Sequence, residues 1–150
     1  MSDDGLWRCS ATELAALIGK GEVSARDVAA AAIARMEAVN PGLNAVVVPC
    51  AEEAMATAAA LDEAQARGEP LGPLHGVPVT VKTNVDQQGH ATSNGVVAFA
   101  DVMASEDSPV VANFRKAGAV IIGRTNTPEF SFRADTDNPL FGRTHNPWGP

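Results

Sequence analysis

The stretch VPVTVK at residues 77–82 decides the fold, because it has the pattern of a buried strand that ends on a charged residue. Side chains alternate along a strand, so the three valines share one face while Thr80 and Lys82 share the other. Strands of parallel sheets are covered on both faces, so we expect the side with Thr80 and Lys82 to be enclosed as well. The stretch therefore predicts an α/β protein with a lysine held inside its sheet.

A lysine enclosed at the end of a strand loses part of its hydration, which favours the neutral amine over the ammonium ion. A neutral amine accepts a proton from a hydroxyl group, so Lys82 is a candidate general base. A structural role is the alternative, in which the methylenes of Lys82 lie along apolar surface and the ammonium stays in water. The polar segment that follows, residues 83–86, favours the base, since open parallel sheets place ligand sites at the carboxyl ends of strands.

A helix and a second strand follow at the spacing of a βαβ unit. Ser108 precedes Pro109 at the predicted helix start, and Gly118 follows the last turn. Residues 119–123 (AVIIG) have the pattern of a second buried strand, which the crossover should make parallel to the first. After this strand, residues 127–129 (TPE) have the pattern of another helix start, with the threonine as cap.

The N-terminal part of the chain has helical periodicity instead. A capping box at residues 10–13 (SATE) predicts one helix, and residues 24–27 (SARD) predict the start of a second that stops at residues 40–42 (NPG). An alanine-rich third helix is predicted over residues 51–66. Before it, residues 43–48 are rich in β-formers but end at a proline, which suits an edge strand or an extended segment.

These patterns divide the chain into a helical arm, residues 1–68, and the start of an α/β core, residues 69–150. The last segment is a series of turns that stops at residues 148–150 (WGP), with no predicted element to hold it. We therefore expect a truncated chain.

The composition is that of a globular protein, since the 150 residues are 45% hydrophobic and are enough for one domain with a real core. The net charge of -7 argues against binding to nucleic acid or to an anionic membrane surface, because both require basic patches. Cys9 and Cys50 lie far apart without a CxxC pair, as in a cytoplasmic protein with reduced thiols. The acidic N-terminus has no apolar stretch of the kind that a signal peptide needs.

The sequence indicates no metal and no cofactor. His75, His90 and His145 fit no metal-ligand spacing, and neither a glycine-rich dinucleotide motif nor a phosphate-binding loop occurs. No serine lies in a G-x-S-x-G elbow, and Ser131 is the best internal candidate for a nucleophile by its neighbourhood alone. By these residues, the chain supplies a candidate base, Lys82, but no clearly identified nucleophile.

Three separated motifs resemble those of the amidase signature family. They are GPLHGVPVTVK at residues 72–82, GAVIIGRTNTPEF at residues 118–130 and FGRTHNPW at residues 141–148, in matching order and spacing. The helical opening, residues 12–45, is similar to the family's N-terminal arm. The resemblance implies a large α/β fold with a mixed sheet, of which residues 1–150 are the N-terminal part of a single, incomplete domain.

The resemblance also implies a function. Enzymes of this family hydrolyse amides with a serine nucleophile, a cis-serine and a lysine, and Lys82 matches the catalytic lysine by position. Both serines belong to a glycine- and serine-rich segment that would lie beyond Pro150, so the resemblance implies a fragment that is inactive by itself. It further implies a small-molecule amide as substrate, with no cofactor, and leaves a homodimer of the complete protein open.

Supporting residues are carried over from the resemblance as well. Thr80, Thr83 and Asn84 are expected to orient Lys82 or to hydrogen-bond with it, and Phe130 and Ser131 are expected to approach the substrate channel. Thr83 departs from the pattern, since many members have aspartate directly after the lysine, and this leaves the subtype open. Two alternatives also stand. One is the A-type subunit of an amidotransferase that acts in tRNA-dependent amidation, and the other is a non-catalytic, truncated chain that serves in binding or interaction.

Overall fold

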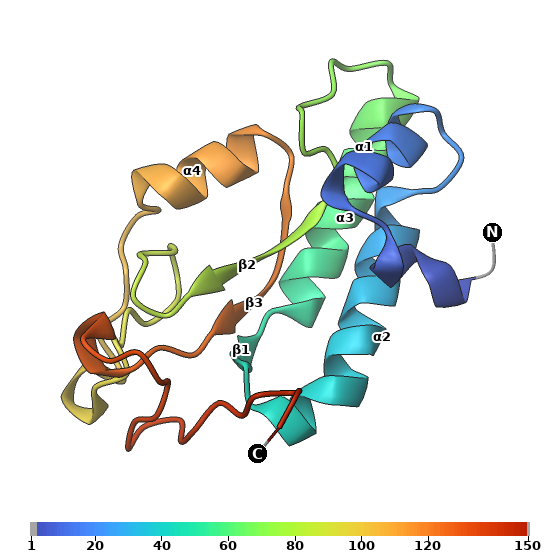
Figure 1. The fold of residues 1–150 in the computed structure, drawn as a ribbon. Helices are drawn as coiled ribbons and strands as arrows, with labels where there is room; N and C mark the ends of the chain where they lie inside the picture. The colour runs from blue at the N-terminus through green and yellow to red at the C-terminus, as the bar shows by residue number, and fades with distance from the viewer. Residues whose placement is uncertain (1–2, 150) are drawn as a thin grey trace. The chain divides into compact units, whose positions relative to one another are not determined.

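The computed structural model describes residues 3–149, which form a mixed α/β structure (Figure 1). The elements follow in the order η1 (Asp3–Arg8), α1 (Ala11–Gly19), α2 (Ala25–Leu43), β1 (Val46–Pro49), α3 (Ala51–Ala66), β2 (Pro78–Lys82), η2 (Val97–Phe99), α4 (Pro109–Lys116), β3 (Val120–Thr125) and η3 (Glu129–Ser131), where η marks a 3-10 helix. The predicted α/β class is confirmed, and α3 has the predicted bounds.

The chain forms two compact units, each assembled from three segments. The first unit consists of Met1–Glu37, Cys50–Val79 and Asn113–Ile122, and the second of Ala38–Pro49, Thr80–Ala112 and Gly123–Pro150. Strands β2 and β3 each begin in the first unit and end in the second.

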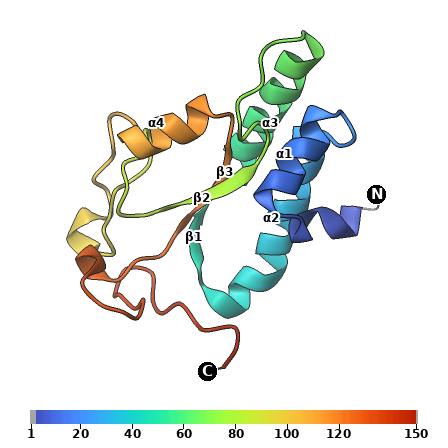
Figure 2. The same ribbon diagram turned by 45° about the horizontal axis from the view of Figure 1, so that its top comes forward.

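The first unit is organised around its helices. Its core cluster consists of Leu6, Leu14, Ile18, Val28 and Val77, all less than 6% exposed. Leu14 and Ile18 are four residues apart, so they lie on one face of α1, as the periodicity predicts. Figures 1 and 2 both show α1 and α3 beside the first part of α2. The core therefore forms where η1, α1 and the first part of α2 meet the residue that precedes β2.

The first two predicted helix starts in this unit carry reciprocal caps. The Ser10 hydroxyl accepts from the Glu13 amide, and the Ser10 amide donates to the Glu13 carboxylate at 2.7 Å, which confirms the capping box. Ser24 and Asp27 form the same pair of bonds at 3.0 and 3.1 Å. The bonds from the Ser10 amide and hydroxyl lower the pKa of the Glu13 carboxyl, and those from the Ser24 hydroxyl and amide lower the pKa of Asp27. Both carboxylates therefore remain charged caps at neutral pH.

Helix α2 does not stop at residues 40–42, as the NPG motif predicts, but continues through Pro41 to Leu43. The Asn44 amide donates to the Asn40 carbonyl at 2.7 Å, which completes the last turn, and Asn44 then takes a left-handed φ of 52°. The Asn40 side chain also accepts from the amides of Ala45 and Val46. The helix therefore ends one residue later than expected, and the Asn40 side chain binds the amides of the two residues that follow Asn44.

The sheet is mixed, with the strand order β1-β3-β2. β1 pairs antiparallel with β3, Val46 opposite Thr125 and Pro49 opposite Gly123, so the predicted edge strand is confirmed. β2 and β3 run in the same direction. The Val120 amide donates to the Val77 carbonyl at one end, and the Thr83 amide donates to the Thr125 carbonyl at the other. The parallel βαβ unit is therefore confirmed, with α4 as its crossover helix.

One expectation for β2 is wrong. The face that carries Thr80 and Lys82 is not enclosed, since Thr80 is exposed and Lys82 is half-buried, although Val81 on the other face is only 4% exposed. Coverage of a sheet face depends on what packs against it, and the exposure of Thr80 shows that the described residues leave this face partly open.

Gly72 lies where the chain enters β2 and passes very close to another backbone segment of the first unit. A Cβ at Gly72 would approach the Ala117 carbonyl oxygen, which also accepts from the Leu74 amide at 2.9 Å. We expect Gly72→Ala to lower the free energy of unfolding by about 1–3 kcal/mol, because a backbone oxygen cannot move aside cheaply.

A urea titration followed by circular dichroism measures this effect. Gly19→Ala is the matched control, since a Cβ at Gly19 meets nothing within 4 Å at the end of α1. The control should be neutral or slightly stabilising, because alanine favours helix. Equal unfolding midpoints for the two variants would contradict the prediction.

Candidate active site

Lys82 is the last residue of β2, and its amine contacts a hydroxyl group within the second unit. Its Nζ lies 3.3 Å from the Oγ of Ser131, a residue 49 positions further along the chain. The Nδ2 of Asn84 donates to the same Oγ at 3.0 Å. The structure therefore brings together three of the residues that the sequence singles out: Lys82, Asn84 and Ser131.

Ser131 reaches this position through an unusual turn. The pattern of residues 127–129 predicts a helix start, but only the 3-10 turn η3 (Glu129–Ser131) forms, so that expectation is wrong. Phe130 and Ser131 have left-handed φ values of 51° and 59°, which side chains other than glycine rarely adopt. The Thr127 hydroxyl donates to the Pro128 carbonyl at 3.0 Å instead of capping a helix, and it lies 2.9 Å from the Ser131 hydroxyl.

Arg124, near the end of β3, was missed by the sequence reasoning. Its side chain is fully buried in the second unit, and its guanidinium donates to the carbonyls of Val85, at 2.6 Å, Lys82, at 3.5 Å, and Ala91. The cation therefore ties the end of β2 to the loop that follows it. The sequence could have indicated this role, because an arginine in an otherwise apolar strand is rarely buried without hydrogen-bond partners.

Two buried asparagines were missed as well. The side-chain amide of Asn138 donates to the side-chain oxygen of Asn126 and to the backbone carbonyl of Thr127, both at 2.8 Å. Asn126 in turn accepts from the Thr127 amide at 2.9 Å and donates to the Gly142 carbonyl at 3.0 Å. These bonds fix Thr127 beside Ser131, and the available signal was the pair of asparagines in the turn-rich segments after β3.

The other predicted site residues lie elsewhere in the second unit. Thr80 is exposed, and the structure records no contact between its side chain and Lys82 within residues 3–149. Thr83 is 1% exposed, and its hydroxyl has no hydrogen-bond partner among those residues. Phe130 is half-exposed and packs between Phe99 and Phe132, with ring centroids 5.8 and 6.0 Å away. The aromatic rings thus lie next to Ser131 in sequence and are partly open to solvent.

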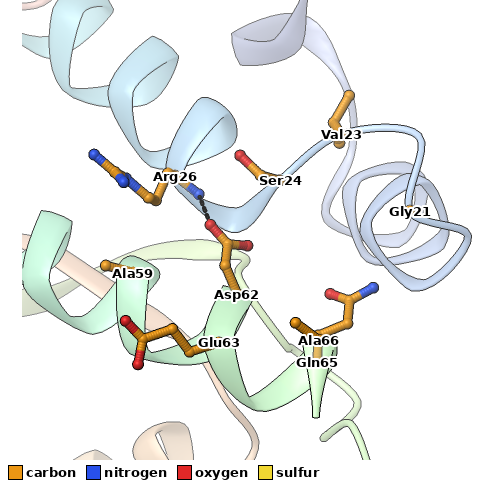
Figure 3. A pocket seen from close by; sticks show the side chains of 9 residues that line it. All are labelled: Gly21, Val23, Ser24, Arg26, Ala59, Asp62, Glu63, Gln65 and Ala66. Carbon is orange, nitrogen blue, oxygen red and sulfur yellow. Dashed lines mark hydrogen bonds between the residues drawn. The ribbon is translucent and has the colours of Figure 1, made fainter. Parts of the chain in front are cut away.

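A separate pocket of about 530 Å³ lies in the first unit, between the start of α2 and α3 (Figure 3). The Asp62 carboxylate occupies the N-terminal end of α2, where it accepts from the amides of Ala25 and Arg26 at 2.7 and 3.2 Å. The positive end of the helix is therefore already neutralised by the chain's own carboxylate, and the pocket offers no free anion site there.

Two features of residues 3–149 bear on metal binding and on crossing a membrane: side-chain clusters that could hold a metal ion, and helices that could form a membrane span. Within that range, no cluster of three or more His, Cys, Asp or Glu side chains is placed to hold a metal ion. None of the helices described there combines the length and the apolar character that crossing a bilayer requires.

Comparisons with known proteins agree with the motif pattern. The family model described as Amidase matches residues 27–150. The chain is 54% identical over 145 residues to an indoleacetamide hydrolase of Bradyrhizobium diazoefficiens, covering 97% of this chain and 28% of that protein. It is 42% identical over 139 residues to the A-type component of a glutamyl-tRNA(Gln) amidotransferase of Salinispora tropica, covering 93% of this chain and 28% of that protein.

The fold comparison points the same way. The crystal structure of a bacterial aryl acylamidase of the amidase signature enzymes matches with a TM-score of 0.89 and 35% identity, covering 94% of this chain and 30% of that chain. The chain thus spans less than a third of the length of each of these proteins.

Proposed function

This chain belongs to the amidase signature family, and we propose that it supplies the general base of an amide hydrolase through Lys82. One observation carries the proposal: at the carboxyl end of β2, the Lys82 amine lies 3.3 Å from the Ser131 hydroxyl. A lysine amine that contacts hydroxyl groups is placed to exchange a proton with one of them, as a general base requires.

The proposed reaction is acyl transfer to a serine. Lys82 takes a proton, through the cis-serine, from the nucleophilic serine, whose Oγ forms a bond to the amide carbonyl carbon. The carbon–nitrogen bond breaks as the leaving amine or ammonia takes the proton back through the same relay. Water then attacks the acyl ester, the carboxylate leaves and the serine regains its proton. The proposal assigns both serines to a part of the enzyme outside residues 1–150, so we expect these residues alone to be inactive.

We place the acyl group of the substrate beside Phe130 and Ser131. Ser131 touches the proposed base, and Phe130, Phe99 and Phe132 form a ring cluster next to it. Aromatic rings of this kind stack well on a flat substrate group. Two similar proteins are named for the hydrolysis of aromatic amides: an indoleacetamide hydrolase and an aryl acylamidase. Their names support an arylacetamide or an aryl amide as the substrate of this protein.

The test is a substrate panel. The protein expressed from its complete reading frame is incubated with indole-3-acetamide, an acyl anilide and glutamine, and release of ammonia or aniline is followed. Hydroxylamine is added in parallel, since it intercepts an acyl-enzyme as a hydroxamate. We expect hydrolysis of an aromatic amide together with hydroxamate formation. Absence of hydrolysis across the whole panel would overturn the proposal and favour a non-catalytic role.

An A-type amidotransferase component is the second candidate, because the Salinispora tropica protein of that kind is 42% identical to this chain. The same panel distinguishes the two functions. Such a component would use glutamine in preference to the aromatic amides, whereas the proposed hydrolase would show the reverse order.

A further inference from the structure

The hydrogen bonds around the Ser131 hydroxyl have directions that follow from the donor capacity of each partner. The Asn84 amide nitrogen can only donate, so Ser131 accepts from it. Thr127 has one hydroxyl hydrogen and donates it to the Pro128 carbonyl. With the Thr127 hydrogen on the Pro128 carbonyl, Ser131 is the donor and Thr127 the acceptor of the 2.9 Å bond between the two hydroxyls.

This arrangement determines whether Ser131 donates a hydrogen bond to Lys82 or accepts one from it. The hydrogen of Ser131 is committed to Thr127, so only a lone pair of its Oγ remains for the lysine. Ser131 is consequently an acceptor for a Lys82 N–H and has no proton to give to the amine. Activation of Ser131 as a nucleophile by Lys82 would require the opposite direction, and the sequence-based candidacy of Ser131 as a nucleophile loses its support.

We propose that Ser131 is a positioning residue that holds one N–H of Lys82 and thereby directs the amine lone pair toward the reacting hydroxyl. The inference rests on the proposed function, in which Lys82 is the base. A neutral lysine has a freely rotating amine with two hydrogens and one lone pair. Fixing one N–H on Ser131 restricts that rotation, so the lone pair is presented in a narrower range of directions before the substrate arrives.

The surroundings of Ser131 hold it for this role. The Phe130 amide donates to the Asn94 carbonyl at 2.9 Å, which stabilises the left-handed turn. Thr127 is fully buried, and its backbone is held by Asn126 and Asn138. Left-handed conformations at two consecutive residues other than glycine persist only when neighbouring groups determine them in this way.

Kinetics of the full-length enzyme test the proposal. Ser131→Ala and Thr127→Val should each lower kcat about 10-fold with KM nearly unchanged, because the lone pair loses its direction while the binding surface remains. Thr127→Ser keeps the hydroxyl acceptor and should restore most of the rate. A purely structural role of Ser131 would lower stability but would leave kcat of the folded enzyme unchanged.

The proposal would be overturned if Ser131→Ala lost as much activity as Lys82→Ala. Ser131 would then be a reacting group.

A second measurement does not depend on hydrolysis. Lys82 is labelled with an amine-reactive reagent, and the modified peptide is quantified by mass spectrometry. The amine in Ser131→Ala should react about threefold faster, because it is no longer held. Ser105→Ala, at an exposed serine of the same unit, should leave the labelling rate unchanged. Unchanged labelling in Ser131→Ala would overturn the positioning role. Faster labelling in a protein that hydrolyses no amide would instead show that the contact exists and that the proposed function fails.

Discussion

Replacement of Lys82 by alanine in the full-length protein should lower kcat/KM for amide hydrolysis by roughly 10⁴-fold, because the reaction loses its general base. The half-buried side chain makes one recorded hydrogen bond, to Ser131, so the fold should tolerate its loss. Lys82→Arg separates a base from a structural anchor. Arginine can lie along the same apolar surface but stays protonated, so a base predicts the same loss of activity and an anchor predicts near-normal activity.

Lys20→Ala is the matched control, since that lysine is mostly exposed and its ion pair with Glu22, at 3.7 Å, lies on the surface. It should leave both activity and stability close to those of the unchanged protein. Initial rates on the best amide of the panel, with circular dichroism to confirm folding, measure all three variants. Activity of Lys82→Ala within 10-fold of the unchanged protein would rule out a general-base role, given the usual size of such contributions.

Arg124→Met should be the most destabilising single change, lowering the free energy of unfolding by about 3 kcal/mol. Methionine fills similar volume but removes the guanidinium that donates to the Val85 and Ala91 carbonyls, whereas the Lys82 carbonyl keeps its bond from the Val85 amide at 3.0 Å. Each buried carbonyl without a partner costs about 1–3 kcal/mol, partly offset because a charge is no longer buried. Amide hydrolysis should fall as well, since the carbonyl of Lys82 belongs to the segment that the guanidinium holds.

Urea unfolding of the full-length protein measures this change. Arg67→Met provides the control, because Arg67 is exposed at the end of α3 and its ion pairs with Glu63 and Glu69 lie on the surface. Exposed pairs contribute about 0–1 kcal/mol, so the control should unfold at nearly the same urea concentration as the unchanged protein. Similar midpoints for the two arginine variants would mean that the buried guanidinium does not hold the loop after β2.

Much of the fold could be predicted because it depends on neighbours in the sequence. The capping boxes join residues three positions apart, and the bounds of α3 follow from alanine-rich helical periodicity. The edge position of β1 follows from its terminal proline, and the parallel pairing of β2 with β3 follows from the handed crossover through α4. Lys82 was found from the alternation of a strand together with the family motif, and its catalytic role stays a prediction.

Tertiary structure decided the rest. The chain after α2 depends on where the Asn40 side chain finds backbone donors. The 3-10 turn η3 replaces a predicted helix where Asn94 binds the Phe130 amide and Asn138 binds the Thr127 carbonyl. The open face of β2 depends on which segments pack against it, and the pattern of a single strand does not encode that.

The same division holds for the candidate site. The sequence by itself determined that a lysine ends a strand beside polar residues, since alternation and turn chemistry act over a few neighbouring positions. Only the folded chain decided that Lys82 meets Ser131 across 49 positions and that Arg124 binds the carbonyls around it. Contacts at that separation arise from how strands pair and loops return, and no local pattern specifies which hydroxyl or carbonyl a side chain will reach.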